Sequence, residues 1–300
     1  MTGVRSDPIV AAMLSFDQTI DPASWRALAP TFHIEDDAFF RAGTAVPLGD
    51  NRRQDLMGQL TFDGYFQESG LDLGIDPARM AGAVRALSAA GIAPVFAFVF
   101  DEFWLPFWRL REWYKGLLGD DYAMMPDFWV WNLDPKRGDA GWPPHRDKGH
   151  FALNPDGTPR ALTTWIPLSD AVPLNGCMYI VPASFDPVYG TPRDGEFRFE
   201  LASVRALPAK AGDVLVWNQS VLHWGGRTSP RAPESRGTKA FEFQTTKIAP
   251  YNKYVLKPDA PPTFAERLKL IAQQVLQYPH MNRPDPATLA LCRKLSDGSS

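Results

Sequence analysis

The chain has 300 residues, of which 45% are hydrophobic and 22% are charged, so it carries enough apolar material for a buried core. A formal net charge of -3 lacks the basic surplus that nucleic acids or anionic membranes attract, so we expect a small-molecule substrate, no nucleic acid and no membrane. The longest strongly apolar run, residues 91–100, is too short to span a bilayer. The N-terminus has no clear secretory signal, which predicts a cytoplasmic protein.

Residues 1–126 have a mostly helical pattern. Asp76 and Pro77 form an N-cap and first-turn pair, and apolar residues follow at helical spacing until Gly91, so one helix is predicted there. Aromatic and leucine residues at steps of four and three predict a second helix over residues 102–118. We expect its aromatic residues to pack in the core, namely Phe103, Trp104, Phe107, Trp108 and Trp113.

Residues 127–246 change to short runs of aromatic and β-branched residues, separated by Pro, Gly, Asn and Asp. No helix-length segment lies between these runs, so they favour a double-sheet jelly roll over a parallel sheet. The fold class predicted is therefore mainly β, with flanking helices around a cupin-like, double-stranded β-helix core. The expected strands are FWVWNL, ALTTWIPL, CMYIVPA, DVLVWNQ and TKAFEFQTT.

Residues 247–300 return to a helical pattern. Thr263 and Glu266 have the spacing of a capping box, and Pro279 closes the helix that they open. With no internal repeat and no long linker, residues 1–300 are expected to form a single domain. The two cysteines, Cys177 and Cys292, have no CxxC spacing and are predicted to be buried or incidental thiols.

The segment WPPHRDKGHF places His145 and Asp147 two residues apart. In extended backbone, residues at this spacing point to the same face, so an imidazole and a carboxylate can converge on one ion. His223 follows the expected strand DVLVWNQ and is the natural third ligand. Two histidines and one carboxylate leave positions open on the metal, which suits ferrous iron in oxygenases better than a closed structural zinc site.

Arg236 and Thr238 open the last expected strand. A guanidinium group beside a hydroxyl is suited to hold one carboxylate of a dicarboxylic acid, because arginine binds planar anions in a bidentate manner. This pattern predicts a 2-oxoglutarate site. Arg227 and Arg231 lie closer to His223 along the chain and remain alternatives for the anchoring residue.

The order of HxD, NGCMYIVPAS, GDVLVWNQSVLHWGG and R-x-T across residues 127–246 resembles the phytanoyl-CoA dioxygenase family of iron(II)/2-oxoglutarate oxygenases. The resemblance implies Fe(II) bound by His145, Asp147 and His223, with 2-oxoglutarate and O2 as cosubstrates. It also implies that Arg236 with Thr238 binds the distal carboxylate. Such an enzyme releases succinate and CO2 while it oxidises, and most commonly hydroxylates, an unactivated C–H bond.

By the same resemblance, Trp165 matches a position near the cosubstrate, and Asn132 lies on a strand that commonly faces the pocket. One departure is Phe185, which stands where the family usually has a histidine after the NGC segment. Asp147 favours hydroxylation over halogenation, because halogenases of this broad class replace the carboxylate ligand with a small residue.

Two other functions fit part of this pattern: a cupin-type metalloenzyme that does not use 2-oxoglutarate, and a non-catalytic small-molecule-binding homologue. The segment 185–200 is either a surface connection or a lid. Arg146 and Lys148 alternate with the metal ligands, so we expect both to point away from the iron on a solvated face, with substrate contact as the weaker option for Lys148. His150 is expected to support the metal ligands or to contact the substrate rather than to bind the metal, and His33 and His280 are expected at the surface.

Overall fold

The computed structural model describes residues 14–252, 256, 260–282 and 284–297. Within them, a five-stranded antiparallel sheet has the order β1-β6-β3-β8-β2, and a three-stranded antiparallel sheet has the order β5-β4-β7. The strands are β1 Tyr65–Glu68, β2 Tyr122–Leu133, β3 Ala161–Pro167, β4 Met178–Val181, β5 Arg205–Leu207, β6 Val214–Asn218, β7 Leu222–Gly225 and β8 Arg236–Thr245.

The two sheets form the jelly-roll core that the strand pattern predicts. All five expected strands are present, and β2 and β8 extend beyond the expected runs. β1, β5 and β7 were not predicted, because each has only three or four residues. His223 follows the strand DVLVWNQ, which is β6, as expected, and it lies in the next strand, β7, which pairs with β4 in the small sheet.

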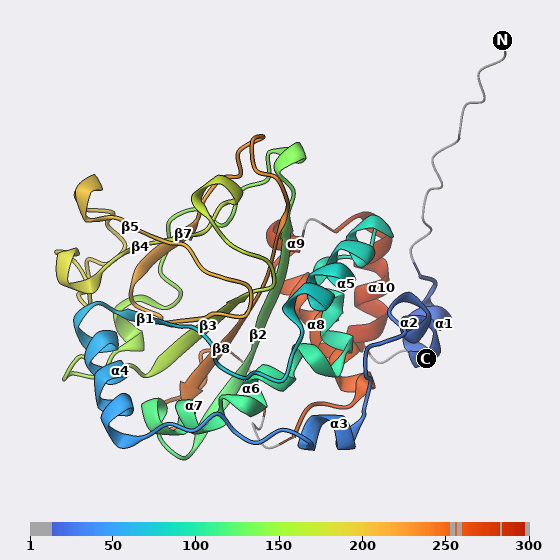
Figure 1. The fold of residues 1–300 in the computed structure, drawn as a ribbon, viewed down its shortest axis with the longest axis horizontal. Helices are drawn as coiled ribbons and strands as arrows, with labels where there is room; N and C mark the ends of the chain where they lie inside the picture. Colours follow the sequence, from blue (N-terminus) through green and yellow to red (C-terminus); the bar gives the residue numbers. More distant parts are fainter. Residues whose placement is uncertain (1–13, 253–255, 257–259, 283, 298–300) are drawn as a thin grey trace, which may run out of the picture.

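Helices cover the face of the large sheet that is turned away from the small sheet (Figure 1). The helices are α1 Phe16–Ile20, α2 Pro22–Leu28, α3 Asp37–Arg41, α4 Asp50–Phe62, α5 Pro77–Ala89, α6 Leu105–Arg109, α7 Arg111–Leu118, α8 Phe264–Gln277, α9 Pro279–Asn282 and α10 Pro286–Asp297. Of these, α5, α7 and α8 pack directly on the large sheet, and α9 lies at the cavity instead. The main hydrophobic core fills the space between these helices and β2, β3 and β8. The small sheet is therefore free to enclose a site against the opposite face.

The predicted helix ends after Asp76 and before Gly91 are confirmed. The Asp76 side chain accepts a hydrogen bond from the backbone N–H of Arg79, and Gly91 has φ 73°, which favours glycine. The single helix predicted over residues 102–118 is wrong. That segment instead contains a 3-10 turn, then α6 and α7, with Leu110 between the two helices at φ -91° and ψ 8°.

Four of the five aromatic residues expected in the core are buried, whereas Trp108 is only partly buried and packs against the core from outside. Phe103, Trp104, Phe107 and Trp113 are at most 4% exposed and belong to the main core, as expected from their spacing. α8 begins at the predicted capping box, in which Thr263 and Glu266 satisfy each other's backbone N–H groups. The predicted thiols Cys177 and Cys292 are free and buried.

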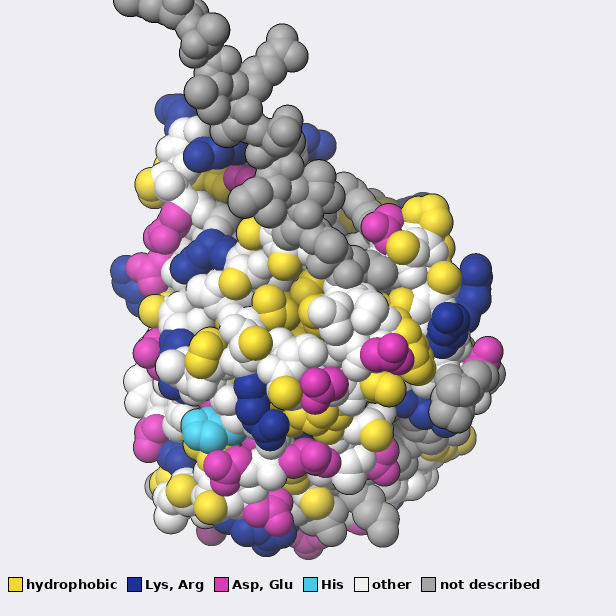
Figure 2. Space-filling view, turned by 90° about the vertical axis from the view of Figure 1, so that its right-hand side faces the viewer, with side chains coloured by type: hydrophobic (Ala, Val, Ile, Leu, Met, Phe, Trp, Pro, Cys, Tyr) yellow, Lys and Arg dark blue, Asp and Glu magenta, His cyan; other side chains and the backbone are white. Residues whose placement is uncertain are grey.

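The described helices include none that is both long enough and apolar enough to cross a membrane. On the face toward which α1, α2 and α10 lie in Figure 1, basic and acidic side chains alternate with apolar ones (Figure 2). No large area of a single charge is visible on that face.

Candidate active site

His145, Asp147 and His223 converge on one point, and among the described residues they form the group of histidine and acidic side chains that could hold a metal ion. The Nε2 atoms of His145 and His223 lie 3.4 and 3.6 Å from the same oxygen, Oδ1 of Asp147. His145 is not in a regular strand, but its backbone pairs with that of His223 through two hydrogen bonds of 3.0 Å. This pairing fixes two ligands from distant parts of the sequence side by side.

Both imidazole rings have the tautomer that a metal requires. Nδ1 of His145 lies 2.8 Å from the carbonyl oxygen of Pro143, and Nδ1 of His223 lies 3.1 Å from that of Val221. A carbonyl oxygen can only accept, so each Nδ1 must donate, and each Nε2 is left with a lone pair. Burial lowers the pKa of His223 to about 4, so this ring stays neutral near pH 7.

Asp147 is held by two donors on its other oxygen. Oδ2 accepts hydrogen bonds from the Thr163 hydroxyl at 2.7 Å and from the Trp217 indole N–H at 2.9 Å. Burial raises the pKa of Asp147, but the two imidazoles and Thr163 outweigh it and keep this pKa below its ordinary value. The carboxylate is therefore ionised, and its Oδ1 is left to face the ion.

Arg236 is a buried cation without an acidic partner among the described residues. It is 2% exposed; one guanidinium nitrogen donates to the carbonyl of Gly176, and its Nε has no hydrogen-bond partner. The nearby Thr238 hydroxyl is also buried and unpartnered. Burial lowers the pKa of Arg236 to about 10, so it remains charged near pH 7. A buried charge of this kind requires a counter-ion, which an anionic ligand would supply.

The two alternative arginines lie elsewhere. Arg227 and Arg231 are exposed, whereas Arg236 lines the same cavity as the three metal-ligand candidates. Trp165 also lines it, and the guanidinium of Arg236 lies 5.6 Å from its ring centre. Of the three arginines, Arg236 is thus the one brought together with the triad.

Asn132 is not brought together with Arg236 in the same way. In the pairing of β2 with β8 it lies opposite Gly237, whereas Leu133 and Trp131 lie opposite Arg236 and Thr238. Because directly opposed residues share a face, the Asn132 side chain points to the other face of the sheet.

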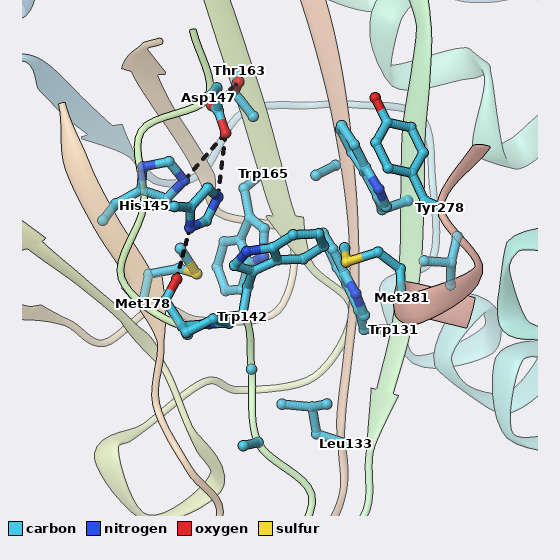
Figure 3. Close-up of a pocket in the computed structure, with 18 of the residues that line it drawn as sticks. Trp131, Leu133, Trp142, His145, Asp147, Thr163, Trp165, Met178, Tyr278 and Met281 are labelled. Atoms are coloured by element: carbon cyan, nitrogen blue, oxygen red, sulfur yellow. Dashed lines mark hydrogen bonds and ion pairs between the residues drawn. The ribbon is translucent and has the colours of Figure 1, made fainter. Parts of the chain in front are cut away.

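The cavity that contains the triad has a volume of about 810 Å³. Figure 3 shows His145, Asp147 and Thr163 on one side of it and Trp131, Tyr278 and Met281 on the other, with Trp165 and Trp142 between them. One wall is rich in aromatic side chains and includes residues of the C-terminal segment, which sequence reasoning missed. This wall contains Trp129, Trp131, Trp142, Tyr278, His280 and Met281.

Aromatic contacts order this wall. The rings of Trp129 and Trp131 stack with an angle of 3° between their planes, and Trp129 lies 6.0 Å from Tyr278. Trp142 contacts both His145 and His280, with ring centres 5.3 and 5.4 Å apart. His280 is exposed, as expected, yet it forms part of the rim of the cavity.

A buried ionic group completes the lining. Glu242 is 2% exposed, and its Oε2 lies 3.3 Å from Nζ of Lys148 but accepts no hydrogen bond among the described residues. Burial raises the pKa of Glu242 to about 8. Lys148 does not point to solvent. Lys148 and Glu242 both line the cavity, which favours substrate contact, the less expected position, over a solvated one for this lysine. No sequence motif marks Glu242.

The other polar residues singled out in the sequence have structural partners, Arg146 and His150 beside the triad and His33 away from it. Arg146 forms a buried ion pair with Asp186 at 2.7 Å, and its guanidinium group points to this partner. The expected solvated position of Arg146 is therefore wrong. His150 lies 3.0 Å from Asp194, and His33 lies 2.9 Å from Glu102. The segment 185–200 thus ties the loop of the metal ligands down through two acidic residues.

A jelly roll with a His-x-Asp pair, a distant histidine and open space beside them is the architecture of mononuclear non-haem iron enzymes. The sequence model of the phytanoyl-CoA dioxygenase (PhyH) family matches residues 83–236, about half of the chain. The chain therefore belongs to this family and is an iron- and 2-oxoglutarate-dependent oxygenase. No curated protein sequence matches the chain at a significant level.

Solved structures share the fold. The α-ketoglutarate-dependent epimerase SnoN from nogalamycin biosynthesis is 22% identical, with a TM-score of 0.50 over 72% of this chain and 94% of its own. The non-haem monooxygenase ThoJ, in a nickel complex, is 18% identical, with a TM-score of 0.50 over 76% and 99%. HygX from Streptomyces hygroscopicus, with iron bound, is 14% identical, with a TM-score of 0.50 over 69% and 90%.

Proposed function

We propose that the protein hydroxylates an unactivated C–H bond of a small organic molecule, with 2-oxoglutarate converted to succinate and CO2. His145, Asp147 and His223 hold Fe(II), and Arg236 with Thr238 binds the distal carboxylate of 2-oxoglutarate. The observation that carries this proposal is the pairing, in one cavity, of a three-ligand metal site with a buried guanidinium that lacks a counter-ion.

The donor set fits ferrous iron. Two neutral imidazole nitrogens and one carboxylate oxygen on the same side leave room for a chelating cosubstrate and for O2. Bound iron supplies the redox chemistry that activates O2 as 2-oxoglutarate is decarboxylated. The chain's own contribution is to orient the three ligands through Pro143, Val221, Thr163 and Trp217.

At the other end of the cosubstrate, a charge-assisted pair with Arg236 would replace the hydration that this guanidinium lost on folding. Trp165 and Met178 line the same cavity as the triad and Arg236 and are at most 7% exposed. The carbon chain of 2-oxoglutarate would lie along this apolar stretch. Asn132 borders the cavity, but its position opposite Gly237 turns its side chain away from Arg236, so we assign it no contact with 2-oxoglutarate.

Anaerobic addition of Fe(II) and 2-oxoglutarate tests the proposal. We expect a weak metal-to-ligand charge-transfer band in the visible spectrum, which requires iron and the chelating cosubstrate in one site. His223→Ala should abolish the band, and Arg227→Met serves as the matched control that retains it. A folded wild-type protein without the band would exclude the proposal.

The SnoN comparison, a 2-oxoglutarate-dependent epimerase by its description, makes epimerisation the second candidate outcome. Both outcomes use the same triad and differ in whether an oxygen atom is added to the substrate. Once a substrate that stimulates succinate formation is found, the product's mass separates them. A gain of 16 mass units is expected for hydroxylation, and no change for epimerisation.

A further inference from the structure

Gln219 is a fully buried residue in the turn between β6 and β7. Its backbone carbonyl accepts hydrogen bonds from the backbone N–H groups of Lys148 at 2.9 Å and Gly149 at 3.0 Å, the two residues that follow Asp147. Gln219 does not line the cavity, so it does not contact a substrate there. It is joined instead to the segment that carries one of the proposed iron ligands.

The side-chain amide of Gln219 points to Thr163. Its Nε2 lies 3.2 Å from Oγ1 of Thr163, and the Thr163 hydroxyl in turn donates to Oδ2 of Asp147 at 2.7 Å. A hydroxyl group has one hydrogen, and an ionised carboxylate can only accept it. The hydrogen of the other bond must therefore come from Gln219, so the amide nitrogen and not the amide oxygen faces Thr163.

Glu242 holds the amide in this orientation. Burial raises the pKa of Glu242, and a hydrogen bond from Gln219 opposes this rise. A hydrogen bond that lowers the pKa of a carboxyl group is donated to it, so it also comes from the amide nitrogen. Thr163 and Glu242 lie opposite each other in the pairing of β3 with β8, which places the two acceptors side by side. The amide oxygen is buried and has no partner among the described residues, so the two donated bonds fix how the amide is turned.

We propose that Gln219 is a positioning residue for the iron ligand Asp147, and that it acts through the Thr163 hydroxyl. The amide hydrogen binds a lone pair of Oγ1 and thereby directs the hydroxyl hydrogen to Asp147. Oδ2 stays occupied, and Oδ1 stays turned to the ion. Without the amide donor the hydroxyl is free to rotate, and the carboxylate then keeps only the bond from the Trp217 indole. This inference rests on the proposed iron site and adds a residue that does not touch the ion.

The test measures the Fe(II) affinity of the full-length protein by competition with a chelator, without oxygen and without 2-oxoglutarate. Gln219→Met removes the amide donor but keeps the length of the side chain and the backbone bonds of this turn. We expect the affinity to fall by about 5-fold, as for one hydrogen bond lost from the support of a metal ligand. Gln274→Met is the control, because Gln274 is also a buried glutamine but lies in α8 and not at the cavity. This control should keep the wild-type affinity.

A double-mutant cycle separates positioning through Thr163 from a general loss of packing. Thr163→Val alone should lower the affinity by about 10-fold. Adding Gln219→Met to it should lower the affinity no further, because the hydroxyl through which Gln219 acts is gone. In Thr163→Ser, which keeps the hydroxyl, Gln219→Met should again lower the affinity by about 5-fold. Losses that multiply to about 50-fold in the Thr163→Val protein would overturn the proposal, as would an unchanged affinity in Gln219→Met alone.

If Gln219→Met does not fold, Gln219→Leu supplies the same comparison. His223→Ala keeps the role of Gln219 separate from the iron site itself. Loss of iron binding in His223→Ala, with no effect of Gln219→Met, retains the iron site and overturns the role of Gln219. An unchanged iron affinity in His223→Ala overturns the iron site and, with it, the role of Gln219.

Discussion

Arg236 is a cation whose counter-ion has to come from outside the described chain. Its burial, the unpartnered Nε and the unpartnered Thr238 hydroxyl beside it all describe a cradle for an anion. Arg236→Met should weaken 2-oxoglutarate binding by about 100-fold, because a bidentate, charge-assisted pair is lost. Calorimetric titration of the anaerobic Fe(II) protein with 2-oxoglutarate measures this change.

The metal-free protein offers a control for this variant. Because Arg236→Met removes an uncompensated buried charge, the unfolding temperature of the metal-free protein should not fall. Arg227→Met, at an exposed position, should leave 2-oxoglutarate affinity unchanged. Unaltered cosubstrate affinity in Arg236→Met would favour a cupin-type enzyme that does not use 2-oxoglutarate.

Thr163 and Trp217 act on the metal through Asp147. Each donates to Oδ2, so Thr163→Val leaves the carboxylate with one donor and more freedom to rotate. We expect iron affinity to fall by about 10-fold, in the range typical of partners of metal ligands. Competition with a chelator measures the affinity. Thr158→Val, which removes a hydroxyl from a surface turn, should not change it.

The triad could be predicted from sequence because its geometry is partly local. His145 and Asp147 are two residues apart, and their spacing alone places them near one ion. Glu242, Thr163 and Trp217 meet only because β6, β3 and β8 pair in one register, in which Trp217, Thr163 and Glu242 lie in a single row. Nothing in the sequence near Glu242 indicates this row.

At the scale of elements, β8 separates two environments by alternation. Arg236, Thr238, Ala240 and Glu242 face the small sheet, while Lys239 faces the helices. Lys239 is fully buried; its Nζ donates to the carbonyl of Phe103 at 2.5 Å and lies 4.1 Å from the ring centre of Phe107. Burial places the pKa of Lys239 well below 10.5.

This burial predicts a pH dependence of stability. Between the low folded pKa and the unfolded value of 10.5, the unfolded chain binds the proton that the folded chain has lost. The contribution of Lys239 to the free energy of unfolding therefore rises with pH, by up to about 1.4 kcal/mol per unit, until the pH reaches the unfolded pKa. Lys239→Met should remove this slope, and urea unfolding from about pH 8 to pH 10 measures the difference between the two proteins.

Lys247→Met is the control, because Lys247 is exposed. The free energy of unfolding should change with pH by the same amount in this control as in the wild type. A wild-type slope equal to that of Lys239→Met would mean that Lys239 is charged in the folded protein.

Elements with strong local signals were predicted, and those that depend on neighbours were not. α5 and α8 have caps in their own sequence, and both begin where those caps predict. The aromatic spacing of residues 102–118 is helical throughout, but it does not reveal the change of direction at Leu110. β7, with four residues, becomes a strand through its pairing with β4.

At the scale of the whole molecule, the metal site joins the two sheets. His223 belongs to β7 of the small sheet, whereas Asp147 is bound by Thr163 of β3 and Trp217 of β6 in the large sheet. The C-terminal segment closes the same cavity through Tyr278, which binds Asp127. A ligand in this position contacts parts of the chain that come together only on folding.

Metal and cosubstrate should therefore stabilise the folded protein as a whole. A ligand at 100 times its dissociation constant adds about 2.7 kcal/mol to the free energy of unfolding. For a chain of this size, that corresponds to a rise of about 5 °C in Tm. Mn(II) with 2-oxoglutarate avoids turnover, and differential scanning fluorimetry measures the shift. His223→Ala should lose the shift, because it removes the ligand that the small sheet provides.

His33→Gln is the matched control for this loss. His33 lies at Glu102, away from the triad, so its replacement changes the Tm of the metal-free protein without changing the shift that metal causes. The comparison thus uses the shift rather than the absolute Tm. An undiminished shift in His223→Ala would place the metal elsewhere, because two of the three ligands alone do not connect the small sheet to the ion.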